Sequence, residues 1–256
     1  MNGYGFRQVA RMEWIKLRSV RSTWWLAAVT VVAMGATGVG VGVGYRSHTP
    51  VATAAQILNN SLSGAILAQL LLGALGALVV TGEYGTGMIR STFAAVPRRR
   101  TVLAAKAAVC AGAALAVGLA GSLAGYLGGQ LAIRGTAIPA ASLGDPANLR
   151  AILLTGVYLA TTALIGVGVG AVVRHSGAAI GTLFGLIFVP MIVVGLFGES
   201  GIAVGRFVPL LMLINSIAVT SPMTGLFSGW ISALVMCGYA AVAILCGAAL
   251  LRHRDA

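Results

Sequence analysis

The sequence is poor in charged residues, and above all in acidic ones. Of its 256 residues, 9% are charged, and 5 Asp and Glu stand against 17 Lys and Arg. An ordinary soluble domain has about a quarter of its residues charged, because its surface faces water. With 58% of its residues hydrophobic, this chain has too few polar side chains to cover such a surface. The composition therefore excludes an ordinary soluble domain and indicates a membrane protein.

The residue patterns that bind nucleotides, metals or acyl groups are also missing. The sequence contains no G-x-x-x-x-G-K-[ST], no H-E-x-x-H and no G-x-S-x-G pattern. Its three cysteines fall in apolar runs and its three histidines are scattered, so neither type has metal-ligand spacing. No acidic residue falls at the centre of an apolar run, where ion-coupled transporters usually carry ionisable groups. We expect no catalytic, cofactor or metal site, and an external source of energy for any transport.

Long apolar runs are what the sequence has instead. An apolar helix needs about 20 residues to cross the hydrocarbon core, and the chain has six such runs. The sequence therefore predicts an all-α polytopic membrane protein, a single transmembrane domain over residues 1–256. The expected spans lie at about 24–44, 61–81, 101–133, 151–173, 178–198 and 230–251.

Residues 1–23 precede the first span and have an amphipathic pattern. Apolar side chains fall on one arc of a helical wheel and arginines on a stripe beside it, which is typical of a helix lying in the cytoplasmic headgroup layer. The alternative is a basic flank that only orients the first span. Glu13 falls inside the apolar arc, so we expect it to pair with Lys16 or with another part of the protein.

Residues 82–100 separate the second and third spans and contain a short helix, predicted over Thr86–Val96. Gly85 and Gly87 separate it from the preceding span, and Pro97 ends it. An amphipathic turn that faces lipid is the alternative. The acidic Glu83 at the end of the span and the Gly-Thr-Gly turn favour contact with protein.

Three other segments connect the spans. Residues 45–60 and 134–150 are expected to be a polar connection and a loop. Residues 199–229 contain an apolar run, 207–214, that is too short to cross and too apolar for a free loop, which favours a re-entrant external segment. A seventh span is the competing interpretation, and it would place the C-terminus outside.

The cations are unevenly divided between the two sides of the membrane. With six spans and the N-terminus inside, the cytoplasmic side holds all of the 17 Lys and Arg except Arg46, Arg134, Arg150 and Arg206. Lys and Arg concentrate on the cytoplasmic side of membrane proteins. Both termini are therefore expected in the cytoplasm, with the chain in the plasma membrane. This distribution also explains the net charge of +12 without a nucleic-acid partner.

Two stretches resemble one family of transporters. Residues 83–100, with E-Y-G-T-G-M-I-R-S-T … P-R-R-R, resemble the permease subunits of type-two ABC exporters. Residues 13–19, E-W-I-K-L-R-S, resemble the N-terminal elbow helix of those permeases. The likeness extends over the whole chain in topology: an elbow, six spans, a cytoplasmic loop after the second span and an irregular external segment before the sixth.

The resemblance implies a dimer of two identical or related permeases on two ATPase subunits. ATP and Mg would bind to those partners, and this chain would bind no cofactor itself. The helix at Thr86–Val96 would be the coupling helix seated in the ATPase, and residues 199–229 would hold the external gate. The implied coupling residues are Glu13, Glu83, Tyr84, Gly87, Met88, Ile89, Arg90, Phe93 and Pro97, and the implied gate residues are Phe207, Pro209, Asn215 and Pro222.

The expected function is export, in which the permease forms the path for a substrate and is powered by its ATPase. Spans rich in Gly, Ala, Leu and Val, with few aromatic residues, favour an apolar or amphipathic substrate. A motor-independent transporter or channel is the alternative, disfavoured because no Asp, Glu, Lys or Arg lies at the centre of a span. A membrane enzyme or scaffold is disfavoured by the absence of clustered catalytic groups.

Overall fold

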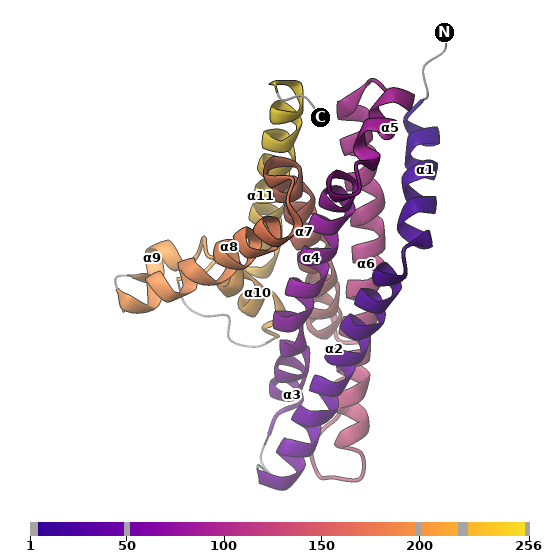
Figure 1. Ribbon diagram of the computed structural model, residues 1–256. Coiled ribbons are helices and arrows are strands. Elements are labelled where there is room, and N and C mark those ends of the chain that lie inside the picture. The colour runs from indigo at the N-terminus through magenta and orange to yellow at the C-terminus, as the bar shows by residue number, and fades with distance from the viewer. Residues whose placement is uncertain (1–4, 49–51, 198–200, 220–224, 254–256) are drawn as a thin grey trace.

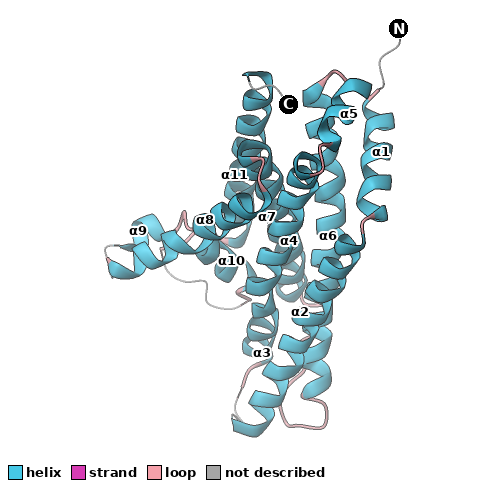
Figure 2. Cartoon of the chain, viewed as in Figure 1, coloured by secondary structure: helices cyan, strands magenta, loops and turns pink. Residues whose placement is uncertain are grey.

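The computed structural model describes residues 5–48, 52–197, 201–219 and 225–253, and all regular structure within these ranges is helical (Figure 2). The described helices are α1 (Phe6–Ser19), α2 (Arg21–His48), α3 (Ala54–Ser61), the 3-10 turn η1 (Leu62–Gly64), α4 (Ala65–Gly85), α5 (Met88–Ala95), α6 (Arg99–Ala132), α7 (Pro146–Val173), α8 (Ser176–Leu196), α9 (Ile202–Gly205), α10 (Pro209–Ile217) and α11 (Gly229–His253).

Six helical segments in the described ranges are long and apolar enough to cross a membrane. They are α2, the continuous segment Ala54–Gly85, α6, α7, α8 and α11. Each contains most of one predicted span, so the expected all-α membrane fold with six spans is confirmed. The short α10 lies within the segment proposed as a seventh span, and its nine residues cannot cross a bilayer.

The central helix of the bundle is α7, which is also the most buried of the six. It packs against α4, α6 and α11, while α2 packs along α6 on the outside (Figure 1). The helix α8 leaves the turn after α7 and runs sideways out of the bundle, where α9 follows it (Figure 1). The small helix α10 returns to pack against α7, α8 and α11.

Glycines bring the backbones of α2 and α6 into contact. A methyl group built at Gly38 would lie 2.0 Å from the carbonyl oxygen of Gly125, so no larger residue fits there. Small residues at such positions let membrane helices approach closely enough for dense van der Waals packing. Gly38 and Gly125 therefore allow this close approach, whereas a methyl group built at Gly40 would meet no atom of another helix within 4 Å.

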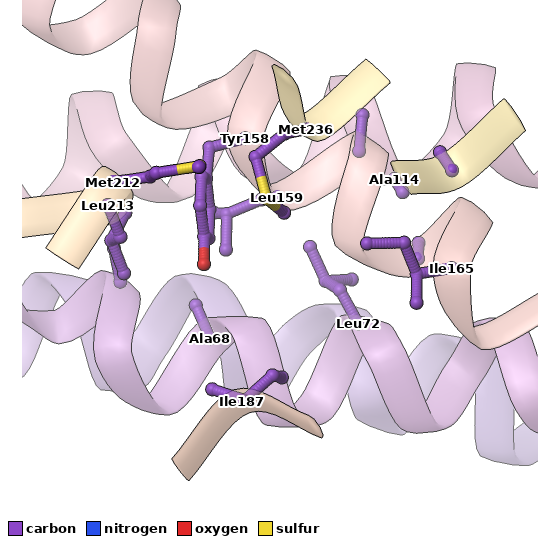
Figure 3. Close-up of a cluster of buried hydrophobic side chains, with 14 of the residues drawn as sticks. Ala68, Leu72, Ala114, Tyr158, Leu159, Ile165, Ile187, Met212, Leu213 and Met236 are labelled. Atoms are coloured by element: carbon purple, nitrogen blue, oxygen red, sulfur yellow. The ribbon is translucent and has the colours of Figure 1, made fainter. Parts of the chain in front are cut away.

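A buried tyrosine marks the centre of the core, where α4, α7, α10 and α11 meet (Figure 3). The Tyr158 hydroxyl lies 2.9 Å from the carbonyl oxygen of Pro209 and 3.0 Å from Oε1 of Gln69. Met212 and Met236 lie beside the ring, and Leu72 belongs to the same buried cluster (Figure 3). Tyr158 therefore joins the short helix α10 to two of the spans by polar contacts inside an apolar core.

Two predicted loops are partly helical. The expected connection 45–60 contains the end of α2 and the helix α3, which Thr53 begins with a capping box to Gln56. The expected loop 134–150 ends early, because Asp145 accepts a hydrogen bond from the Ala147 N–H and Pro146 occupies the first helical position. The N-termini of α3 and α7 both carry standard helix-starting signals. The helices therefore begin before the apolar runs that follow.

Different helices lie at the two ends of the bundle. The start of α1, the helix α5 and the end of α11 lie at one end, and α3 lies at the other (Figure 1). The helix α5 therefore lies at the same end as both described chain ends. This arrangement requires an even number of crossings, as the six spans provide.

Candidate functional site

The short helix α5 is positioned by a sharp turn at its start. The backbone of α4 ends at Gly85, and Gly87 adopts a left-handed conformation with φ of 71° just before α5 begins. A residue with a side chain is strained in that conformation, which glycine adopts readily. The turn separates α5 from α4, and Pro97 follows the end of α5 before α6 begins.

The two faces of α5 have different surroundings. Ile89 and Thr92 are buried and Phe93 is half-buried, all directed toward the rest of the chain. Met88, Arg90, Ser91 and Ala94 are exposed. The apolar side of this helix is therefore covered by the protein itself, and its more polar side is available to a partner.

A small apolar cluster holds α5 and α1 against the start of α6. Val9 of α1, Val96 after α5 and Val102 of α6 are each at most 5% exposed and pack together. Phe93 packs against this cluster from its edge. Burying such side chains stabilises the contact by about 1.5–3 kcal/mol each. The helices α5 and α1 are therefore both held against the start of α6.

Four charged side chains form a buried ionic cluster beside this contact, which we call the ionic cluster: Glu13 and Lys16 of α1, Glu83 of α4 and Lys106 of α6. The Lys106 amine lies 2.7 Å from Oε2 of Glu13 and 2.7 Å from Oε1 of Glu83. The Lys16 amine lies 3.1 Å from Oε1 of Glu13 and 2.8 Å from Oε1 of Glu83. The cluster ties three helices together at one point.

The ionic cluster also reaches α5. The Lys16 amine lies 3.1 Å from the Thr92 hydroxyl, on the inner face of α5. Lys16 thus has three acceptors for its three N–H donors, and Lys106 has a third contact at 3.4 Å to the carbonyl oxygen of Val79. A movement of α5 is therefore resisted by hydrogen bonds to charged groups, which are stronger than those between neutral groups.

The surroundings of Lys16 favour its protonated form. Burial lowers the pKa of Lys16, but hydrogen bonds and attraction from Glu83 and Glu13 outweigh it and place that pKa above its usual value. Lys16 therefore stays protonated at neutral pH, and two cations balance two carboxylates. One acceptor is left over, since Oε2 of Glu83 is buried without a hydrogen-bond partner among the described residues.

A second connection links α5 to the end of α11. The Arg99 guanidinium lies 5.3 Å from the centre of the Phe93 ring, and one of its nitrogens donates to the carbonyl oxygen of Leu251 at 2.9 Å. Nearby, the Arg174 guanidinium lies 5.1 Å from the centre of the Tyr84 ring. Cation–π contacts of this kind join the turn after α7 to the end of α4.

The structure places the predicted coupling residues at one end of the bundle but in different environments. Glu13 and Glu83 are brought together in the ionic cluster, and Tyr84 is half-buried. Ile89 and Phe93 point inward. The exposed members, at which a partner could bind directly, are Gly87, Met88, Arg90 and Pro97.

Sequence reasoning missed three members of this site: Lys16 as a bridge, Lys106 and Thr92. Lys106 is one of the cations expected on the cytoplasmic side, yet its side chain is 3% exposed. Its place inside an apolar helix was the available signal, because a buried cation requires a carboxylate partner. Thr92 lies one turn after Ile89 on the inner face of α5. Nothing in the sequence around it indicates that it contacts a lysine.

The predicted gate residues lie around α10. Pro209 begins that helix, and the buried Asn215 donates a hydrogen bond to the carbonyl oxygen of Phe227. The Phe207 ring meets the Phe227 ring edge-on, with 5.2 Å between their centres, and Arg206 lies over both rings. Pro222 lies outside the described residues. The gate assignment stays a prediction.

Among the described residues, no three His, Cys, Asp or Glu side chains gather as metal ligands would. In the comparison with protein families, residues 10–191 match the model of the ABC-2 family transporter protein. This match runs from α1 into α8 and therefore includes the ionic cluster and α5. No curated protein sequence matches the chain.

Proposed function

Since the chain belongs to the ABC-2 family of transporter proteins, it is a multi-pass permease of an ABC transporter, and we propose that it exports its substrate with energy from ATPase subunits that dock on α5. Permeases of this family work with an ABC ATPase in general. ATP and Mg would bind to that partner, and two permease copies or paralogues would line the path.

The observation that carries this proposal is the attachment of α5. A helix that transmits force must expose one face to the motor and be fixed by the other face to the elements that move. The outer face of α5 exposes Met88, Arg90 and Ser91. Its inner face is joined to α1, α4 and α6 through the ionic cluster and the contact of Lys16 with Thr92. The geometry suits a coupling helix.

The distribution of cations supports a cytoplasmic position for α5. The helix lies at the same end of the bundle as α1 and the end of α11 (Figure 1). The four arginines expected outside, Arg46, Arg134, Arg150 and Arg206, belong to other segments, and Arg46 lies in the last turn of α2, a helix that packs against α3. The excess of Lys and Arg at the α5 end is typical of the cytoplasmic side.

The mechanism follows from this rigid connection. Closure of the ATPase subunits on ATP would move the docked α5 helices, and each α5 would move its attached α1, α4 and α6. A motor contact that differs between two arrangements of the permease shifts the equilibrium between them. Substrate would then be accepted in one arrangement and released outside in the other.

The apolar interior supports an apolar or amphipathic substrate. The described surfaces of the spans expose Val, Leu, Ile and Phe side chains, and no ionic cluster other than the one beside α5 is present in the described ranges. The path between two copies would therefore offer apolar contacts. The buried helix α10 and the rings of Phe207 and Phe227 would close its external end.

A charge reversal on the outer face of α5 tests the proposal. Arg90→Glu changes an exposed side chain without touching the ionic cluster, whereas Glu83→Ala would also destabilise the fold. Arg134→Glu, an equally exposed arginine expected on the other side, is the matched control. We expect Arg90→Glu to lower the substrate-stimulated ATPase activity of the purified complex by about tenfold or more, with normal insertion. Equal activity in both variants would refute the docking of the ATPase on α5.

A further inference from the structure

A cavity of about 450 Å³ lies between α1, the start of α2, α4 and α6, next to the ionic cluster. Packed protein interiors contain few voids larger than a water molecule. This cavity is far larger than such a void and has the size of a ligand pocket. The cavity is partly open to its surroundings, so a molecule from outside the protein can enter it.

Most of the cavity wall is apolar. Leu17 of α1, Leu75, Leu78 and Val79 of α4 and Val109 of α6 line it. Ordered water finds too few polar partners along this part of the wall. The wall therefore favours a hydrocarbon chain as the occupant.

The edge of the cavity has the features of a membrane interface. Ser22 and Thr23 line it, and the next two residues in the chain are the exposed Trp24 and Trp25. Paired tryptophans are typical of the headgroup level of a bilayer. Such a position gives the hydrocarbon chains of the neighbouring leaflet direct access to the cavity.

Two arginines lie close in the sequence to residues at this edge. Arg18 and Arg21 flank the lining residue Val20 in the chain, and neither has a carboxylate partner in the described part of the protein. The two acidic groups that line the cavity, Glu13 and Glu83, are already neutralised by lysines. Basic residues at this depth attract anionic lipid headgroups.

We propose that the cavity binds one acyl chain of an anionic phospholipid from the cytoplasmic leaflet, with its phosphate beside Arg18 and Arg21. The lipid would occupy the space between α1 and α4, directly behind the residues that fix α5. This is a binding site in addition to the transport path, and it relies on the proposed function only for the side of the membrane.

Photo-crosslinking tests the site on the full chain in phosphatidylcholine vesicles. The probe is phosphatidylglycerol with a diazirine in its acyl chain, and labelled peptides are identified by mass spectrometry. We expect labels at Leu17 and at Leu75–Val79 of the cavity wall, as well as at Leu234, an exposed residue of α11 that reports general lipid contact. No ATPase is needed, so failure of this test is separate from failure of the coupling proposal.

Filling the cavity provides the decisive comparison. Leu78→Trp, or Val109→Trp if the first variant does not insert, places a large ring in the cavity and should reduce labelling of Leu17 by about tenfold. Leu67→Trp changes an exposed residue of the same helix and should leave that labelling unchanged. Labelling of Leu234 confirms insertion in each variant.

The headgroup requirement is tested with a second probe, a phosphatidylcholine that carries the same diazirine-labelled acyl chain. We expect weaker labelling of the cavity by this probe, and Arg21→Gln should reduce the preference for phosphatidylglycerol by about fivefold. Cavity labelling that is absent in the unaltered chain, equal for both headgroups, or retained in both tryptophan variants would overturn the proposal.

Discussion

Removal of the Lys106 amine is the perturbation with the largest predicted consequence for the fold. Lys106→Met keeps most of the aliphatic chain and deletes two ion pairs, each at 2.7 Å, to Glu13 and Glu83. All three side chains are at most 5% exposed, so water screens these pairs poorly. Loss of one partner from a buried ion pair costs about 3–5 kcal/mol, because a charge is left uncompensated.

The expected loss for Lys106→Met lies at the lower end of this range, at about 3 kcal/mol. Lys16 still contacts both carboxylates, at 3.1 and 2.8 Å, and continues to neutralise one negative charge. The remaining cluster has one cation and two carboxylates, and Oε2 of Glu13 joins Oε2 of Glu83 as an unpaired acceptor. The loss should appear as a lower free energy of unfolding, measured by circular dichroism during titration with a denaturing detergent.

A second substitution separates charge from packing. Glu13→Gln in the Lys106→Met background restores one cation to one carboxylate, so we expect it to recover about 1–2 kcal/mol. If Lys106 mattered only by filling space, the second change would add a further loss. A single variant within about 0.5 kcal/mol of the unaltered chain, or a double variant less stable than Lys106→Met, would refute the reasoning.

Two further predictions concern the packing of the spans. Gly38→Ala should lower the free energy of unfolding by about 1–3 kcal/mol, since its methyl group would meet the Gly125 carbonyl, whereas Gly40→Ala, with open space around it, should be close to neutral in the same titration. Tyr158→Phe should cost about 1–3 kcal/mol, because its contact to Pro209 is lost inside the core; unchanged stability would show that this contact does not hold α10 in place.

The sequence was sufficient to predict the spans, because they depend on local composition. Runs of apolar residues long enough to cross a bilayer placed six helices, and the structure has each of them. The helix starts at Thr53 and Pro146 were missed although both carry N-terminal signals, since polar residues between spans were interpreted as loops. Helix ends at a membrane surface depend on capping as well as on hydrophobicity.

The candidate site was only partly predictable, because it depends on contacts between distant segments. Glu13 and Glu83 stood out as isolated acids in a basic, apolar chain. Lys106, however, looked like another cation at the start of a span, and its partners lie 93 and 23 residues away in the sequence. The inward orientation of Ile89 was equally hidden, since an amphipathic helix shows that one face is covered but not by what.

The coupling role of α5 is tested most directly by identifying the protein that contacts its outer face when the complex is in its native membrane. A photoreactive amino acid in place of the exposed Ser91 should crosslink the permease to its ATPase subunit, identified by a Walker sequence in the adduct. The same amino acid in place of Ser142, an exposed residue in the loop after α6, should give no such adduct. A missing adduct at position 91, or equal adducts at both positions, would contradict the account.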